Sequence, residues 1–170
     1  AYALCCNIGD KNAMERIAAI RKISKKHNFT LICRDLSELS TYAKVSNNVF
    51  RLLKNNTPGA YTFILPATKE VPRRLMNEKK RTIGIRVPAG AIIEALLNEC
   101  SEPLLSCSLI LPDHEEPEND PITINDEIGS IVDVIVDGGV LDAMPTTVIR
   151  FEDDMPVVRR VGRGDPTPFS

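Results

Sequence analysis

Short sets of cationic and hydroxyl side chains recur at the predicted ends of strands, and the chemistry that they could perform is anion binding. Proteins hold phosphate groups with cationic side chains, hydroxyls and free backbone N–H groups, often at glycine turns. Such sets occur at Arg21-Lys22, Arg86, Ser106-Cys107-Ser108, Pro145-Thr146-Thr147 and Arg160-Val161-Gly162. Each set alone is a weak signal, because a serine pair also forms turns and an arginine also forms surface ion pairs. Their recurrence at strand ends predicts a phosphate-binding surface.

Basic residues gather in three clusters, which are Arg21, Lys22, Lys25 and Lys26; Arg73, Arg74, Lys79, Lys80 and Arg81; and Arg159, Arg160 and Arg163. An acidic stretch over residues 113–127 holds seven carboxylates and no basic residue. Taken singly, each basic cluster is typical of solvated helix ends and turns. If the clusters converge on one cleft, they create a positively charged face. The sequence leaves both alternatives open.

Familiar catalytic and metal-binding motifs are absent from the chain. It contains no GxGxxG, P-loop, HExxH or GxSxG motif and no CxxC pair. The two histidines lie far apart, so we expect no metal held by protein side chains. His27 follows the first basic cluster and precedes a predicted strand, a place where active-site residues of open α/β sheets occur. The alternative is a loop histidine without a role.

The elements that must position these residues alternate between strands and helices. Strands are predicted over residues 2–6, 30–33, 60–65, 82–87, the first part of 104–111, 131–136, 146–151 and 157–160. Helices are predicted after the N-caps Asp10 and Asp35, around residues 49–53 and over 91–97. Interleaved helices early and paired strands late predict a single α/β domain with a sheet of mixed direction.

Composition sets further bounds on the function. The 170 residues fit one domain, and the net charge of −2 argues against binding nucleic acid by bulk charge alone. No apolar run is long enough for a membrane-spanning helix, so we expect no membrane partner. Five cysteines, three of them in strand-like runs at Cys5, Cys33 and Cys107, favour a reducing compartment and a cytoplasmic location. The chain opens without methionine at Ala1, inside a predicted strand, and we expect a segment to precede it.

Several ordered segments together resemble a known family. They are residues 56–65, Ile85-Arg86-Val87-Pro88, residues 102–108, Pro145-Thr146-Thr147-Val148-Ile149 and Val158-Arg159-Arg160-Val161-Gly162. In this order they look like the YrdC-like family, the threonylcarbamoyl-adenylate synthases of tRNA modification. The stretches 27–30 and 34–40 resemble its YciO branch. The resemblance spans essentially the whole chain.

The resemblance implies a twisted mixed parallel and antiparallel sheet with flanking helices and a concave, positively charged face. Residues 1–170 would form one YrdC-like domain that lacks its N-terminal strand and turn. Active members join L-threonine, bicarbonate and ATP, supplied with Mg²⁺, into threonylcarbamoyl-AMP and pyrophosphate. A partner enzyme then transfers the threonylcarbamoyl group to adenosine in tRNA.

The same resemblance assigns roles to single residues. Tyr2 and Arg86 match positions of the amino-acid pocket. The positions that match nucleotide or phosphate contacts are Arg21, Ser108, Thr146 and Arg160.

Two departures from the family's motifs weaken the expectation of full activity. Arg21-Lys22-Ile23 stands where the synthases have KxR, and Ser108-Leu109-Ile110 stands where they have S-x-N. Each lost charge-assisted contact costs about 1.5–3 kcal/mol, and two such losses would slow the reaction by roughly two to four orders of magnitude. Lys22, Lys25 or Lys26 could compensate.

Three functional hypotheses follow. The first is a nucleotide-binding enzyme that forms threonylcarbamoyl-AMP at a reduced rate. The second is a non-catalytic module for double-stranded or structured RNA, tRNA included, with contacts from Lys22, Lys25, Lys26 and His27. The third is a protein that binds a nucleotide and a partner without turnover.

Overall fold

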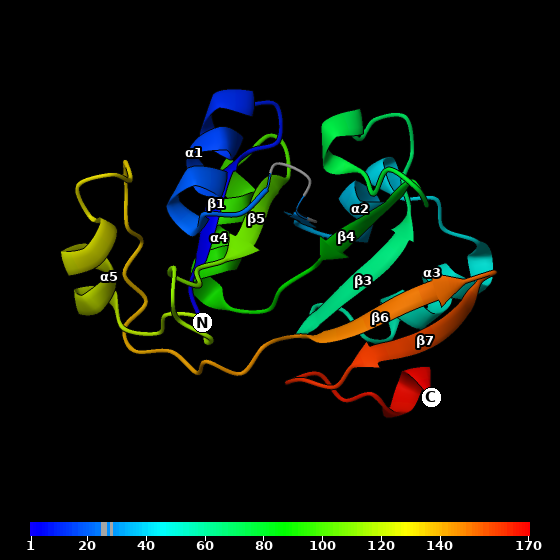
Figure 1. The fold of residues 1–170 in the computed structure, drawn as a ribbon. Coiled ribbons are helices and arrows are strands. Elements are labelled where there is room, and N and C mark those ends of the chain that lie inside the picture. The colour runs from blue at the N-terminus through cyan, green and yellow to red at the C-terminus, as the bar shows by residue number, and fades with distance from the viewer. Residues whose placement is uncertain (25–26, 28) are drawn as a thin grey trace.

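A computed structural model describes residues 1–24, 27 and 29–170, and its strands form one mixed sheet (Figure 1). In the described residues the sheet has seven strands in the order β1-β5-β2-β4-β3-β6-β7. The strands are β1 (Ala3–Asn7), β2 (Thr30–Ile32), β3 (Tyr61–Pro66), β4 (Thr82–Arg86), β5 (Leu104–Ser108), β6 (Thr147–Glu152) and β7 (Met155–Arg160). Two pairs, β2–β4 and β3–β6, are parallel and the others are antiparallel. The predicted mixed α/β sheet is confirmed.

Five helices in the same residues flank this sheet. They are α1 (Lys11–Arg21), α2 (Leu36–Tyr42), α3 (Asn47–Lys54), α4 (Ala91–Glu99) and α5 (Pro121–Ile128), with short 3₁₀ turns at Arg73–Leu75 and Thr167–Phe169. The predicted N-caps are confirmed, because the Asp10 side chain accepts from the Ala13 N–H and the Asp35 side chain from the Glu38 N–H. No helix in the described part of the chain is long and apolar enough to cross a bilayer.

The two faces of the sheet differ in chemistry. On one face, directly paired residues form an apolar row across six strands, in the order Cys6, Leu105, Leu31, Ile85, Phe63 and Ile149. The adjacent row points to the other face, since side chains alternate along a strand. That row runs Ser106, Thr30, Gly84, Ile64 and Arg150, and it is more polar.

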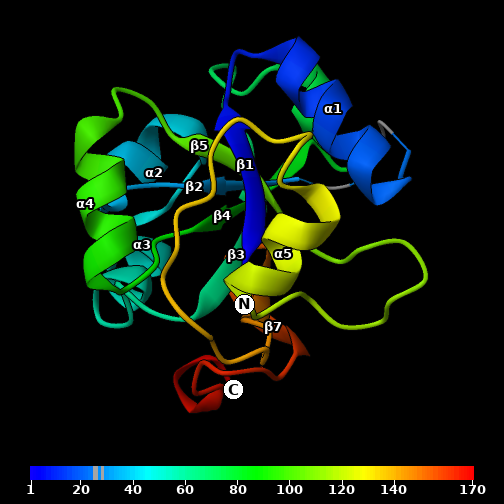
Figure 2. The ribbon, with the colours of Figure 1, turned by 90° about the vertical axis from the view of Figure 1, so that its left-hand side faces the viewer.

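Helices α1 and α4 cover opposite faces of the β1–β5 end of the sheet (Figures 1 and 2). Met14 and Ile17 of α1 join the core cluster that contains the apolar row. Leu97 of α4 instead packs against Ile32 and Leu104 in a second cluster. Helices α2, α3 and α5 contribute to the larger cluster. The middle of the polar row is therefore left open for a ligand.

The predicted strand over residues 131–136 is wrong. In the described residues this segment pairs with no strand. Val132 and Ile135, spaced by three, pack against the core, while Val134 is 76% exposed. Arg16 of α1 donates to the Ile131 carbonyl over 2.9 Å. The alternating pattern is thus satisfied by irregular packing along the edge of the fold.

Two further predictions about apolar positions need correction. Cys5 is exposed, although Cys33 and Cys107 are buried as expected. On α4, Ile92 is 52% and Leu96 37% exposed, so the predicted apolar side of this helix is only partly buried. Cys5 and the α4 residues lie at places where neighbouring elements end.

A β-bulge distorts the hairpin of β6 and β7. Val158 pairs with Ile149, but Arg160 pairs with Val148, so Arg159 is an extra residue on β7. The tight turn before it uses Asp153 and Asp154, whose φ angles of 48° and 63° fit the twist of a two-residue hairpin. The bulge changes which side of the hairpin the end of β7 presents. Val148, Arg150 and Arg160 therefore share one face.

Candidate functional site

A cleft of about 580 Å³ lies over the polar face of the sheet and contains residues from all seven described strands. Seven of the predicted site residues line it: Tyr2, Arg21, His27, Arg86, Ser108, Thr146 and Arg160. They come from segments far apart in the sequence, and the strand order brings them together. Lys22 does not line the cleft; it is the exposed, left-handed C-cap of α1. Lys25 and Lys26 lie outside the described residues.

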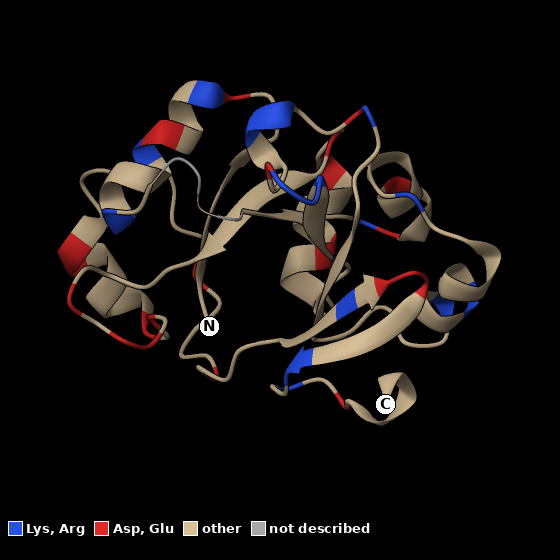
Figure 3. Cartoon of the chain, turned by 45° about the vertical axis from the view of Figure 1, so that its right-hand side comes forward, with Lys and Arg blue, Asp and Glu red and all other residues tan. Residues whose placement is uncertain are grey.

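The described lining of the cleft is positively charged. It includes four arginines, Arg21, Arg86, Arg150 and Arg160, and no carboxylate. Figure 3 shows acidic positions elsewhere, in the turn between β6 and β7 and around α5. A cleft with one sign of charge concentrates ligands of the opposite sign. The arrangement is therefore suited to an anion.

Arg86 at the end of β4 is held without a full set of partners. Its Nε is buried and makes no hydrogen bond. Burial lowers the pKa of the Arg86 guanidinium, and nearby Cys5 acts in the opposite direction. A buried donor without an acceptor costs stability unless a ligand supplies the acceptor. A carboxylate or phosphate would do so.

Hydroxyl and guanidinium groups form a second cluster at the β6–β7 side. The Thr62 and Thr146 hydroxyl oxygens lie 2.7 Å apart. Arg160 donates to the Thr146 carbonyl oxygen through Nε at 3.2 Å and NH2 at 2.9 Å. These contacts fix the Arg160 guanidinium beside two hydroxyls, which are groups that bind phosphate oxygens.

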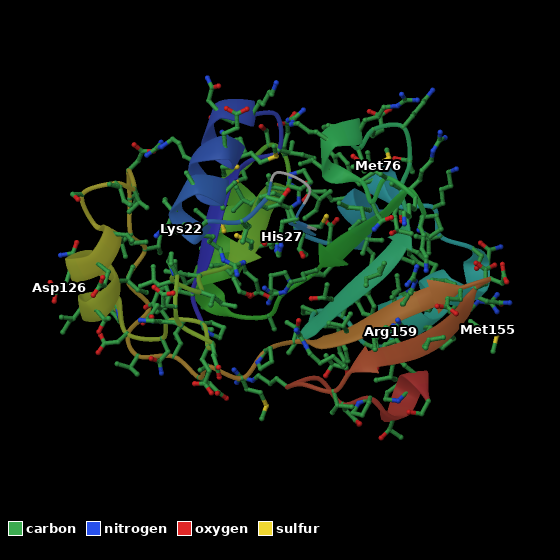
Figure 4. The ribbon with its side chains drawn as sticks, viewed as in Figure 1. Lys22, His27, Met76, Asp126, Met155 and Arg159 are labelled. Atoms are coloured by element: carbon green, nitrogen blue, oxygen red, sulfur yellow. The ribbon has the colours of Figure 1, made fainter. Side chains whose placement is uncertain are left out.

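Arg21 and His27 lie at the other end of the cleft, where α1 ends. The Arg21 Nε donates to the Ile110 carbonyl over 3.3 Å. His27 packs edge-on against Phe29, with ring centroids 5.8 Å apart, and Figure 4 shows it between α1 and β4. Partial burial lowers the pKa of the exposed His27, and Arg21 lowers it further. His27 is therefore neutral at neutral pH.

Tyr2 uses its hydroxyl to hold a neighbouring loop. It donates to the Gly139 carbonyl at 2.6 Å and accepts from the Gly138 N–H at 3.0 Å. Its ring lines the cleft while its polar end is occupied. Tyr2 therefore shapes the wall of the site.

The structure separates the two motif departures. Ile110 lines the cleft, as expected for a residue in place of a ligand-binding amide. Ile23 packs against the hydrophobic core and is outside the cleft. The interpretation of Ile23 as a lost cation of the site is therefore wrong, because its side chain points to the core.

The three basic clusters converge only in part. Arg21 and Arg160 line the cleft, but no basic residue of the stretch 73–81 does; Leu75 and Asn77 represent that stretch in the lining. Arg74 donates instead to the Ile8 carbonyl over 2.9 Å. The positive charge of the cleft comes from strand ends and from the end of α1.

Sequence reasoning missed four lining residues that share the polar face, and these are Thr30, Thr62, Ser106 and Arg150. The signal that could have found them is the alternation of buried and half-buried residues along β3 and β6. No group of histidine, cysteine and carboxylate residues in the described chain could hold a metal ion.

The fold and the cleft can be compared with known proteins. The model of a family named Sua5_yciO_yrdC and described as "Telomere recombination" matches residues 1–162. The chain belongs to the Sua5/YciO/YrdC family. Its fold and the arginine-lined cleft are therefore those of a chain related to threonylcarbamoyl-AMP synthases.

Three members of the Sua5/YciO/YrdC family illustrate the range of similarity. The "Uncharacterized protein YciO" of Escherichia coli is 61% identical over 168 residues, 99% of this chain and 82% of YciO. The crystal structure of E. coli YciO superposes with a TM-score of 0.92 at 60% identity, covering 100% of this chain and 82% of that one.

More distant members carry functional names. Threonylcarbamoyl-AMP synthase of Vibrio vulnificus is 26% identical over 140 residues, 81% of this chain and 74% of the synthase. The structure of P. abyssi Sua5 complexed with L-threonine shares the fold, with a TM-score of 0.84 at 24% identity over 95% of this chain and 47% of that one.

Proposed function

We propose that this protein binds ATP and L-threonine in the arginine-lined cleft and forms threonylcarbamoyl-AMP. The observation that carries the proposal is the Arg86 Nε, which is buried in the cleft without an acceptor. A synthase among the relatives and the threonine complex of P. abyssi Sua5 support the same chemistry. Mg²⁺ enters as part of the MgATP substrate.

The proposed reaction has two bond-forming steps. The threonine amine attacks the carbon of bicarbonate, and water leaves to give a carbamate. A carbamate oxygen then attacks the α-phosphorus of ATP, the bond to the β-phosphate oxygen breaks, and pyrophosphate leaves. Arg86 holds the threonine carboxylate, while Arg160 and the Thr62–Thr146 hydroxyls hold phosphate oxygens. Catalysis by such groups is positioning and charge stabilisation.

The direct test is pyrophosphate release from ATP, measured with and without threonine and bicarbonate. We expect release only when both are present. Arg160→Ala should lower kcat/KM by about tenfold to a hundredfold, because a charge-assisted contact is worth about 1.5–3 kcal/mol. Arg159→Ala is the matched control, since the bulge leaves Arg159 outside the cleft lining. Release that ignores either threonine or bicarbonate would overturn the proposal.

RNA binding is the second candidate, and exposed basic residues near the cleft favour it. Arg73, Lys79, Lys80 and Arg81 are exposed on the stretch whose Leu75 and Asn77 line the cleft. Binding through phosphates releases counterions, so the affinity for a structured RNA should fall steeply between about 50 and 200 mM salt.

The RNA test compares two double variants with wild type by a filter-binding titration. Lys79→Gln with Lys80→Gln should weaken binding and flatten the salt dependence by roughly two charges. Lys54→Gln on α3, whose Val49 and Leu53 pack into the core, should change neither. An affinity for RNA that is insensitive to salt would exclude this second function.

A further inference from the structure

Arg150 on β6 is a cleft residue that neither the motifs nor the family resemblance singled out. Its side chain is only 16% exposed, and it lines the cleft. Its one printed partner is Glu152, whose Oε1 lies 3.6 Å from the Arg150 Nε, and the Glu152 side chain is 50% exposed. That distance is longer than a good hydrogen bond. Arg150 is thus a largely buried cation with a loose counterion at the edge of the cleft.

The β-bulge places Arg150 beside Arg160. Arg160 is directly opposite Val148, and Val148 and Arg150 point to the same face because they are two residues apart on β6. Two residues along a strand span about 7 Å. The two guanidinium groups therefore start from neighbouring positions on one face, next to the Thr62–Thr146 hydroxyl pair.

Two cations at this spacing need more than a single carboxylate. Like charges repel, and no carboxylate in the described lining separates these two. Arg160 is braced by the Thr146 carbonyl, which leaves NH1 of its guanidinium without a described hydrogen bond. A ligand with several linked anionic groups would engage both guanidinium groups at once. A polyphosphate has this chemistry, with adjacent charged groups along one chain.

We propose that Arg150 and Arg160 together form a polyphosphate clamp that selects a nucleoside triphosphate over a monophosphate. The inference rests on the proposed function for the identity of the nucleotide, and it adds Arg150 as a specificity-determining residue. Glu152 competes with the ligand for Arg150. The clamp supplies cationic charge from β6 to a cleft in which Ile110 provides none.

The clamp is tested by calorimetric titration of the full chain with inorganic pyrophosphate and, separately, with AMP. Arg150→Gln should weaken pyrophosphate binding by about tenfold to a hundredfold, the equivalent of one charge-assisted contact, and should change AMP affinity less than about twofold. Arg159→Gln, the adjacent arginine outside the cleft lining, should change neither affinity. Thermal unfolding of each variant establishes that the fold is intact.

Glu152 provides the reciprocal test. Glu152→Gln should strengthen pyrophosphate binding several-fold, because it removes the competing carboxylate, and the gain should vanish when Arg150→Gln is also present. Equal losses of pyrophosphate and AMP affinity in Arg150→Gln, or a gain from Glu152→Gln that survives without Arg150, would overturn the clamp. Pyrophosphate binding that needs Arg150 in a protein without threonine-dependent turnover would uphold the clamp and reject the proposed reaction.

Discussion

Replacing Arg86 with methionine should eliminate threonine-dependent pyrophosphate release and, in the same protein, raise the free energy of unfolding. The guanidinium is the proposed partner of the threonine carboxylate, and a lost bidentate contact of about 3 kcal/mol or more reduces kcat/KM for threonine by at least about a hundredfold. The unfolding energy rises because the free protein buries the Nε without an acceptor. Methionine fills a similar volume without that cost, so we expect a gain of about 1–2 kcal/mol.

The experiment combines the coupled pyrophosphate assay with urea unfolding. Arg51→Met on the outer part of α3 is the matched control, since Arg51 is exposed and lies outside the cleft lining. It should change activity and stability little. A less stable Arg86→Met protein would mean that the guanidinium is satisfied in the free state, and the argument for an open ligand position would fail.

Phe63→Ala should have the largest effect on stability. Phe63 is 0% exposed in the centre of the apolar row, with ring centroids of Tyr61, Phe169 and Phe151 at 5.6, 5.7 and 6.3 Å. Removing a buried phenylalanine ring costs about 3–5 kcal/mol. A typical domain has only about 5–15 kcal/mol in total. The variant should therefore be close to unfolding at 37 °C.

The adjacent residue gives a direct comparison. Ile64 points to the cleft, so Ile64→Ala should cost much less stability and should instead change ligand affinity. Because the chain has no tryptophan, circular dichroism is the suitable probe of urea unfolding. Equal destabilisation by the two substitutions would contradict the assignment of the two faces of β3.

Local signals predicted much of the fold. The Asp10 and Asp35 caps are formed within one helical turn, and their chemistry is visible in the sequence. The strand over residues 131–136 failed because alternation reports which side chains are apolar and contains no information on whether a neighbouring strand is available. In the fold, Arg16 binds that backbone at Ile131.

The site was predictable to the extent that it follows motifs. Arg86 and Arg160 belong to segments that resemble the family, and both line the cleft. Arg150 was not predictable in this way, since its position in the cleft depends on strand order and on the alternation of β6. Ile23 was misassigned because spacing alone does not distinguish a cleft residue from one that packs on the core.

The extra residue Arg159 also has an evolutionary consequence. It separates the part of β7 that is paired in register with the core, ending at Val158, from the tip that carries Arg160. Losing one residue there would present a different side chain to the ligand while Val158 and Ile149 remained paired. The tip of this hairpin can therefore diversify without disturbing the foundation of the fold, which gives members of one lineage a short path from one anionic substrate to another.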